Sequence, residues 1–301
     1  MKTCKLAPAT KDYVWGGQLL KQYGKGLNQD RVAEAWELSF HPDGLTLISS
    51  GEYKGKLLKD VVTPKDLGTS VSKFPFFPLL IKLIDSEQDL SVQVHPSDHY
   101  ALKNENSLGK TEMWYIVGAK KGSVIYVGFK KQYSSQEIHN SLLDGTILNK
   151  LNTIKVKPDE SYFIEAGTVH AIGKGITILE IQQNSNLTYR LFDYNRVDTN
   201  GNARELHLEK AMDVLRMEPY RNAKFKKPII GASKYFVTKT LAVKESYELI
   251  STTKSFISVT ILEGSGSIDG IPFSQFDTFF IPANSKVLIE GNTRLVTVCV
   301  K

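Results

Sequence analysis

Four side chains of metal-ligating type occur in order along the chain: Gln93, His95, Glu112 and His170. Imidazole nitrogens and carboxylate oxygens are frequent ligands of zinc and other transition metals, whereas an amide oxygen is a less common one. Burying such polar groups without a partner costs free energy, and a bound metal ion would compensate for that cost. The set therefore predicts a metal site, provided that the fold brings the four residues together.

The first two candidates belong to one short predicted strand, LSVQVH. Because side chains alternate along a strand, its three apolar side chains share one face, and Ser91, Gln93 and His95 share the other. We expect the apolar face to form part of a barrel wall. The polar face would then reach into the barrel interior.

The other candidates come from two further strands. In GKTEMWYI, alternation places Lys110, Glu112 and Trp114 on the same face. His170 follows the tight turn EAGT, which reverses the chain after another predicted strand. Neighbouring strands of one barrel can therefore supply all four candidate ligands.

Taken singly, none of these residues specifies a metal site. A histidine such as His95, which precedes Pro96, is more often a hydrogen-bonded structural residue than a ligand. The remaining histidines lie in turn-like or helix-like polar segments, and we interpret them as structural or exposed: His41, His99, His139 and His207. The metal prediction depends on the combination and order of Q-x-H, E and H.

Most of the chain is predicted to form short β-strands. Segments rich in β-branched and aromatic residues are separated by Gly, Pro, Asn or Asp, as in FPLLIKLID, SYFIEAG, ITILEIQQ and FISVTILEG. Helical patterns are few, and occur in VTPKDLGTSV, SSQEIHNSLLDGTILNKL and ELHLEKAMDVLRM. Closely spaced strands without βαβ alternation predict a mainly β fold, a sandwich or jelly roll with short helical insertions.

The polar, basic segment MEPYRNAKFKKPIIGASK is the predicted linker between two similar halves. PDESYFIEAGTVHAI matches SQFDTFFIPANSKVLI, and MWYIVGAKKGSVIYVG parallels VTILEGSGSIDG, which places His170 opposite Val287 and Glu112 opposite Ser258. The second half therefore lacks both candidate ligands. We predict two β-barrel units, one catalytic and one degenerate, with convergent β patterning as the alternative. The predicted units span residues 1–218 and 219–301.

Composition excludes several classes of protein. With 301 residues, 41% hydrophobic and 23% charged, the chain can form one large or two modest cores. The N-terminus lacks the apolar stretch of a signal peptide, and no run approaches the roughly 20 apolar residues of a membrane helix, so we expect a cytoplasmic protein. The net charge of +6 is spread along the chain, which argues against a nucleic-acid-binding patch and is compatible with an anionic small substrate.

Several motifs together resemble one known family. SVQVHPSD, GKTEMWYIV, FIEAGTVHAIGKGITILEIQQ and NLTYRLFDYNR, with YVWGGQLL and EAWELS nearer the start, are similar to the short bacterial form of type I mannose-6-phosphate isomerase, a zinc-dependent member of the cupin superfamily. The strong motifs cover roughly residues 10–210, and the resemblance continues weakly to the end. It implies two cupin-like jelly-roll β-barrels and one zinc ion per chain.

The resemblance also implies roles for the residues that match the family motifs. The implied zinc ligands are Gln93, His95, Glu112 and His170. The side chains implied to line the catalytic pocket are Lys110 and Arg190. Those similar to the family's phosphate-contacting positions are Ser91 and Lys82. One departure is Asn186, which stands where many relatives have Asp four residues before the pocket arginine, so a proton-transfer role at that place is in doubt here.

The implied reaction interconverts mannose 6-phosphate and fructose 6-phosphate through a cis-enediol. Zinc would polarise the carbonyl and stabilise an oxyanion. Lys110 would have to be neutral to act as the base, which a nearby cation favours; alternatively it remains charged beside the oxyanion and a hydroxide on the metal takes the proton. Arg190 could stabilise the enediolate or bind the phosphate. Its alternative, non-catalytic role is a surface ion pair with Asp193 or Asp198.

Two rival functions fit the same fold. A cupin iron dioxygenase generally uses more imidazoles around an open, redox-active metal, and the Gln together with the lysine argues against it. A non-catalytic sugar-phosphate-binding cupin is the second rival, and the Asn186 departure is compatible with it. We expect a small-molecule sugar phosphate as partner, no nucleic acid or membrane, and a monomer or weak homodimer.

Overall fold

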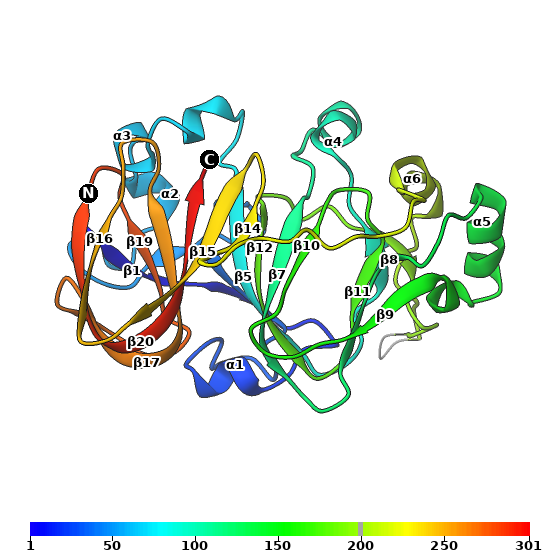
Figure 1. The fold of residues 1–301 in the computed structure, drawn as a ribbon, viewed down its shortest axis with the longest axis horizontal. Helices are drawn as coiled ribbons and strands as arrows, with labels where there is room; N and C mark the ends of the chain where they lie inside the picture. The colour runs from blue at the N-terminus through cyan, green and yellow to red at the C-terminus, as the bar shows by residue number, and fades with distance from the viewer. Residues whose placement is uncertain (198–200) are drawn as a thin grey trace. The chain divides into compact units, whose positions relative to one another are not determined.

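A computed structural model describes residues 1–197 and 201–301, which form mostly β-strands and a few short helices. The described residues group into two compact units (Figure 1). Unit 1 contains residues 1–13, 18–83 and 224–301, and unit 2 contains residues 14–17 and 84–223. The predicted mainly β fold with short helical insertions is confirmed, although its sheets are not closed barrels.

Unit 2 is built from two sets of antiparallel strands (Figure 1). The first is a five-stranded sheet in the order β13 (Tyr189–Phe192), β6 (Val92–Val94), β11 (His170–Ile172), β8 (Val124–Phe129) and β9 (Leu151–Lys155). In the second set, β7 (Glu112–Ala119) pairs with β10 (Ser161–Ile164) and with β12 (Ile176–Gln183). Val92, Val94 and Ala171 belong to one buried apolar core, as the alternation in LSVQVH predicts.

Short helices interrupt the strands of unit 2. They are α4 (Asp98–Asn104), α5 (Ser135–Leu143), the 3-10 helix η2 (Ile147–Lys150) and α6 (Leu208–Val214). At the start of α5, the Ser134 hydroxyl accepts from the Glu137 N–H, and the Glu137 carboxylate accepts from the Ser134 N–H. This reciprocal capping box satisfies two backbone donors and explains why the helix begins there. Both α5 and α6 lie in segments predicted to be helical.

Unit 1 contains a nine-stranded sheet. Its main path is β14 (Ile229–Ala232), β15 (Phe236–Val243), β20 (Lys286–Val300), β17 (Ile257–Ile268), β19 (Thr278–Ile281), β1 (Cys4–Ala7) and β4 (Leu47–Ile48). β16 (Ser246–Ile250) pairs with β20 and β18 (Ile271–Phe273) pairs with β17, which completes the nine strands. Outside this sheet, β2 (Ala9–Lys11) pairs with β3 (Glu34–Leu38). Its helices are α1 (Leu19–Gln22), α2 (Leu58–Val61), α3 (Pro64–Leu67) and the 3-10 helix η1 (Val71–Lys73). β5 (Leu79–Ser86) runs along the chain from unit 1 into unit 2.

The compact units do not follow the predicted boundary between residues 218 and 219. β1 pairs with β19, with Cys4 opposite Phe280, so strands from the two ends of the chain complete each other's hydrogen bonds. Residues 1–13 and 18–83 therefore group with the C-terminal segment. The predicted linker 217–234 contains the change of unit after residue 223, but its last part forms β14. That one unit is catalytic and the other degenerate stays a prediction.

Candidate metal centre and active site

The four predicted metal ligands converge in unit 2. Gln93 lies in β6, His95 follows that strand, Glu112 begins β7 and His170 begins β11. His170 is paired with Gln93 across two neighbouring strands, and Arg190 of β13 is paired with Gln93 from the other side. Directly opposed residues of antiparallel strands project to the same face of a sheet. The pairing thus aligns one amide, one imidazole and one guanidinium on that face.

The ligand atoms of these side chains lie close together. His95 Nε2 is 3.1 Å from His170 Nε2, and Gln93 Nε2 is 3.4 Å from His170 Nε2. The Glu112 carboxylate lies 3.5 Å from His95 Nε2 and 3.4 Å from His170 Nε2. The two imidazoles and the carboxylate are buried, and Gln93 is half-buried. These side chains form a group that can hold a metal ion.

Backbone carbonyls set the orientation of both imidazoles. His95 Nδ1 donates to the Leu187 carbonyl at 2.7 Å, and His170 Nδ1 donates to the Thr168 carbonyl at 2.8 Å. With the ring protons on Nδ1, both Nε2 atoms present lone pairs, as in metal-ligating histidines. Two lone pairs facing each other across 3.1 Å repel unless a cation lies between them. The imidazoles are therefore arranged to bind a cation.

The spacing of the ligand atoms fits a tetrahedral zinc shell. Ligand atoms about 2.0–2.1 Å from zinc in a tetrahedron are separated by about 3.3–3.4 Å. Four of the separations among these side chains range from 3.1 to 3.5 Å, and the ligand atoms of His95, Glu112 and His170 all lie within 4.8 Å of one another. Rotation of the Gln93 amide by about 180° exchanges its oxygen and nitrogen and presents the oxygen to a cation. The residues present thus fit zinc in both chemistry and spacing.

Burial keeps His170 in the form that a metal requires. Its side chain is fully buried, and burial lowers the pKa of His170 to about 4. The Lys110 charge lowers this pKa further, while the hydrogen bond to the Thr168 carbonyl opposes the shift. The imidazole is consequently neutral at pH 7, as metal ligation demands.

Lys110 contacts the same group of side chains. Its Nζ lies 2.8 Å from Glu112 Oε2 and 3.0 Å from His95 Nε2, and its side chain is 5% exposed. The backbone reaches this position through Gly109, where a Cβ atom would lie 2.4 Å from the backbone nitrogen of Asp98. A side chain at residue 109 would therefore displace the segment that carries Lys110.

Arg190 lies beside the ligand group, and among the described residues it does not form the ion pair with Asp193 considered as its alternative role. Its Nε donates to Ser91 Oγ at 3.3 Å, and its Nη1 donates to the Glu205 carbonyl at 2.8 Å. The Asp193 carboxylate pairs with Arg196 and Arg204 instead. The other partner considered, Asp198, lies outside the described residues. Burial, and then the charge of Arg204, lowers the pKa of Arg190.

Lys82, the second predicted phosphate contact, belongs to unit 1. Its Nζ lies 3.1 Å from Glu34 Oε2 and 4.8 Å from the centroid of the Trp36 ring. Trp36 Nε1 also donates to Glu34 at 2.6 Å, so the three side chains form one cluster. Phosphate binding by Lys82 stays a prediction.

Sequence reasoning missed several residues that organise the site. The carbonyls of Thr168 and Leu187 orient the imidazoles, but every residue has a carbonyl, so the sequence gives no signal for them. Asn186 immediately precedes Leu187, so this departure from the family pattern lies in the loop that holds His95. The sequence shows Arg196 and Arg204 as charged residues after a strand, in DYNRVDTNGNAREL. It does not show that both pair with Asp193.

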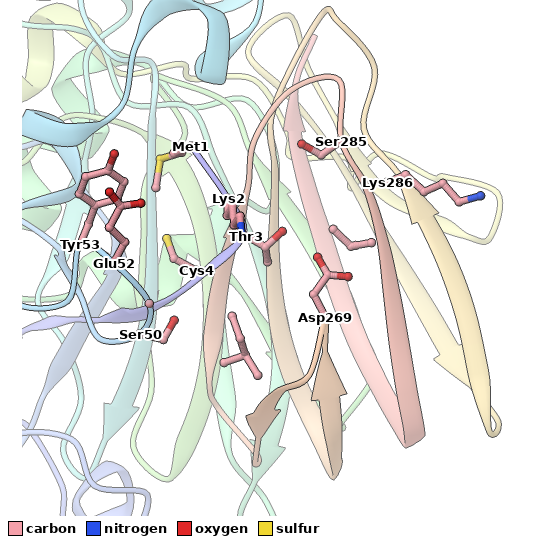
Figure 2. A pocket seen from close by; sticks show the side chains of 13 residues that line it. Met1, Lys2, Thr3, Cys4, Ser50, Glu52, Tyr53, Asp269, Ser285 and Lys286 are labelled. Carbon is pink, nitrogen blue, oxygen red and sulfur yellow. The ribbon is translucent and has the colours of Figure 1, made fainter.

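A separate pocket lies in unit 1 and contains none of the predicted site residues. Figure 2 shows it between the N-terminal strand, the loop around Glu52 and the strand ends near Asp269 and Ser285. Its volume is about 500 Å³.

Among the described residues, no helix has the length and apolar character needed to cross a membrane.

Comparisons with known proteins show the family to which the chain belongs. Residues 3–139 match the model of the phosphomannose isomerase type I catalytic domain. The chain is 36% identical to the mannose-6-phosphate isomerase ManA of Bacillus subtilis over 91% of each chain, and 36% identical to the mannose-6-phosphate isomerase of Streptococcus mutans over 85% of this chain and 83% of that protein. A crystal structure of mannose 6-phosphate isomerase from Bacillus subtilis superposes with a TM-score of 0.87 and 32% identity over 99% of both chains. The predicted jelly-roll fold and family are thereby confirmed, and the chain belongs to the type I phosphomannose isomerases.

Proposed function

We propose that this protein is a zinc-dependent mannose-6-phosphate isomerase that interconverts mannose 6-phosphate and fructose 6-phosphate. The observation that carries the proposal is the pair of imidazole Nε2 atoms 3.1 Å apart. Both Nδ1 atoms donate to backbone carbonyls, and Lys110 Nζ lies 3.0 Å from His95 Nε2. Relatives that are 36% identical over most of the chain bear this enzyme's name. A cytoplasmic location, and a monomer or weak homodimer, stay predictions.

The proposed ligands of one zinc ion per chain are Gln93, His95, Glu112 and His170. A zinc ion held there supplies Lewis-acid polarisation of the substrate carbonyl. Two imidazoles and an amide are neutral, so the Glu112 carboxylate is the one anionic ligand in this set. A centre with a single anionic ligand keeps a net positive charge, which suits stabilisation of a developing oxyanion.

Lys110 is the residue to which we assign proton transfer. The reaction removes the proton from C2 and places one on O1, giving an enediol; a proton then adds to C1 while O2 loses its own. A neutral Nζ can take the C2 proton and return it to C1. Asn186 cannot serve instead, because its amide does not exchange a proton in this way.

Two residues orient the sugar phosphate in this proposal. The guanidinium of Arg190 is permanently charged and lies on the same sheet face as Gln93, where it can stabilise the enediolate or bind phosphate. The Ser91 hydroxyl lies 3.3 Å from Arg190 Nε and adds a hydrogen-bond donor beside it. Lys82 completes the phosphate contacts proposed from the family motifs.

A coupled assay tests the function directly. Conversion of mannose 6-phosphate is followed through fructose 6-phosphate to glucose 6-phosphate, with purified, chelated and zinc-restored protein. We expect activity to disappear on chelation and to return with zinc. No turnover by zinc-replete protein would contradict the enzyme proposal and favour a sugar-phosphate-binding cupin.

Isotope exchange tests the proton-transfer route. In tritiated water, an enediol intermediate incorporates tritium into the product, because the proton held by the base exchanges with solvent. A hydride shift between C1 and C2 leaves the product unlabelled. Tritium in the product would therefore exclude the hydride shift and support proton transfer by a base such as Lys110.

A further inference from the structure

Two arginines pair with one buried carboxylate immediately after β13, and a third, Arg190, lies within reach of its charge. Asp193 is 5% exposed, and it accepts hydrogen bonds from both Arg196 and Arg204. Arg204 binds it in bidentate fashion, with Nε 2.7 Å from Oδ2 and Nη2 2.5 Å from Oδ1. Fork-like pairing of this kind fixes the guanidinium plane as well as its position. Arg204 is therefore held in a defined orientation.

Arg196 anchors the other side of the same carboxylate. Its Nη2 lies 2.5 Å from Asp193 Oδ1, and its Nη1 donates to the Asp89 carbonyl at 2.6 Å. The intervening Tyr194 and Asn195 have φ values of 56° and 54°, which bend the chain back so that Arg196 meets Asp193. This arrangement ties the end of β13 to the segment that precedes β6.

Charge is not balanced within this cluster. One Asp193 carboxylate faces Arg196 and Arg204, and Arg190 lies close enough for the Arg204 charge to lower its pKa. The Glu205 carboxylate is 82% exposed, so water screens its attraction to the arginines. The cluster is therefore electropositive next to the strand that carries Gln93.

Two guanidinium edges in the cluster have no hydrogen bond to a described residue. Within residues 1–197 and 201–301, the bonds of Arg204 use Nε and Nη2, and those of Arg190 use Nε and Nη1. The Arg204 side chain is 31% exposed, so solvent or a ligand reaches it. Paired arginine edges match the oxygens of a phosphate group.

We propose that Arg204 and Arg190 together bind the phosphate of the sugar phosphate, and that Asp193 is the positioning residue that holds Arg204 in place. This inference rests on the proposed function and extends its phosphate contacts beyond Ser91 and Lys82. The phosphate is on C6 and the reaction occurs at C1 and C2, so the phosphate site must lie to one side of the metal ligands. Arg190, paired with Gln93, links the two places.

The test compares Arg204→Gln with Arg216→Gln, an arginine of the same unit that pairs with Glu165 and is 54% exposed. We expect Arg204→Gln to raise KM for mannose 6-phosphate roughly 10- to 100-fold, the range for losing a charged hydrogen bond. Its kcat should change by a smaller factor than its KM, and its turnover of unphosphorylated mannose should fall by a smaller factor than its turnover of mannose 6-phosphate. Arg216→Gln should match the wild type in all three measurements.

Calorimetry with inorganic phosphate provides a readout that needs no turnover. Arg204→Gln should weaken phosphate binding by the same factor as KM, while Arg204→Lys, which keeps the charge, should recover part of it. Asp193→Asn should weaken phosphate binding without altering mannose turnover.

Two results would overturn the assignment. One is an unchanged KM and unchanged phosphate binding in folded Arg204→Gln protein. The other is an equal loss of kcat/KM for mannose and mannose 6-phosphate, which would indicate a purely structural cluster. If the wild type binds phosphate but has no isomerase activity, the proposed function fails and the arginine assignment is still decided by calorimetry.

Discussion

The two units have related strand pairings but opposite kinds of polar interior. In unit 2, β7 pairs with β10 and β12; in unit 1, β17 pairs with β19 and β20. Glu112 begins β7 and faces the metal ligands, whereas Ser258, its predicted counterpart, lies in β17 and is buried. Similar strand pairings therefore carry a proposed metal ligand in unit 2 and a buried hydroxyl in unit 1.

The buried charges of unit 1 neutralise each other. Lys25 Nζ lies 2.9 Å from Glu37 Oε1 and donates to the Phe276 carbonyl at 2.9 Å. Both side chains are almost completely buried. Burial raises the pKa of Glu37, and the Lys25 charge opposes that shift. The two opposite charges of this pair therefore compensate each other.

In unit 2, by contrast, atoms of the same polarity converge. The Nε2 atoms of His95 and His170 face each other with a carboxylate beside them. Such an arrangement is unfavourable by itself and becomes favourable with a bound cation. Converging lone pairs, more than buried charge as such, distinguish a candidate metal site from a structural ion pair.

The largest expected effect comes from removing a ligand in unit 2. His170→Ala should lose zinc, and its activity should fall at least about 100-fold, because the charge stabilisation at the reacting carbonyl is lost. Metal analysis and the coupled assay measure the two quantities. His139→Ala, an exposed histidine of α5, is the matched control and should keep both. Retention of zinc by the His170 variant would remove it from the ligand set.

Lys110→Ala separates catalysis from metal binding. Loss of a general base should lower activity by roughly 10²–10⁴-fold while zinc content stays at the wild-type level. Lys120→Ala serves as the control, because Lys120 is exposed and its ammonium pairs with the exposed carboxylate of Glu87. Normal activity in the Lys110 variant would exclude it from the mechanism, and loss of zinc would make its role structural.

Glu37→Gln breaks the ion pair of unit 1. Removing one partner leaves the other charge buried without compensation, and we expect the free energy of unfolding to fall by about 3–5 kcal/mol. Denaturant titration measures this change. Glu87→Gln, in an exposed pair with Lys120, should change stability by less than about 1 kcal/mol. Similar stability of the two variants would show that the Lys25–Glu37 pair is as weak as a surface pair.

Local patterns in the sequence predicted the elements and most of the candidate site. Period-two alternation placed Gln93 and His95 on one face, with Val92 and Val94 in the core on the other. The predicted helical segment VTPKDLGTSV contains α3, where Thr63 accepts from the Asp66 N–H and Pro64 occupies the first turn. Such features depend on neighbouring residues and are therefore readable from short segments.

Long-range pairings could not be predicted in the same way. Nothing local to Cys4 indicates that its strand pairs with Phe280, so the boundary predicted at residue 218 did not anticipate how the ends of the chain group together. Likewise, His207 was interpreted as structural or exposed, yet its Nδ1 accepts from the Arg190 N–H at 3.2 Å. Both features depend on contacts that only the folded chain creates.

The smallest expected effect tests the residue predicted to correspond to His170. Val287 is 2% exposed and packs in the core of unit 1 with Val259 and Ile289. Val287→Ala should lower the free energy of unfolding by about 1–3 kcal/mol, because it removes buried methyl groups and leaves a small cavity. Denaturant titration gives the stability.

Zinc content and KM for mannose 6-phosphate should not change in this variant, since unit 1 supplies none of the proposed zinc ligands. The comparison with His170→Ala then becomes quantitative: corresponding positions of two related units affect different properties, metal binding in one and stability alone in the other. A marked change in KM in folded Val287→Ala protein would contradict this separation and show that the core around Val287 contributes to substrate binding.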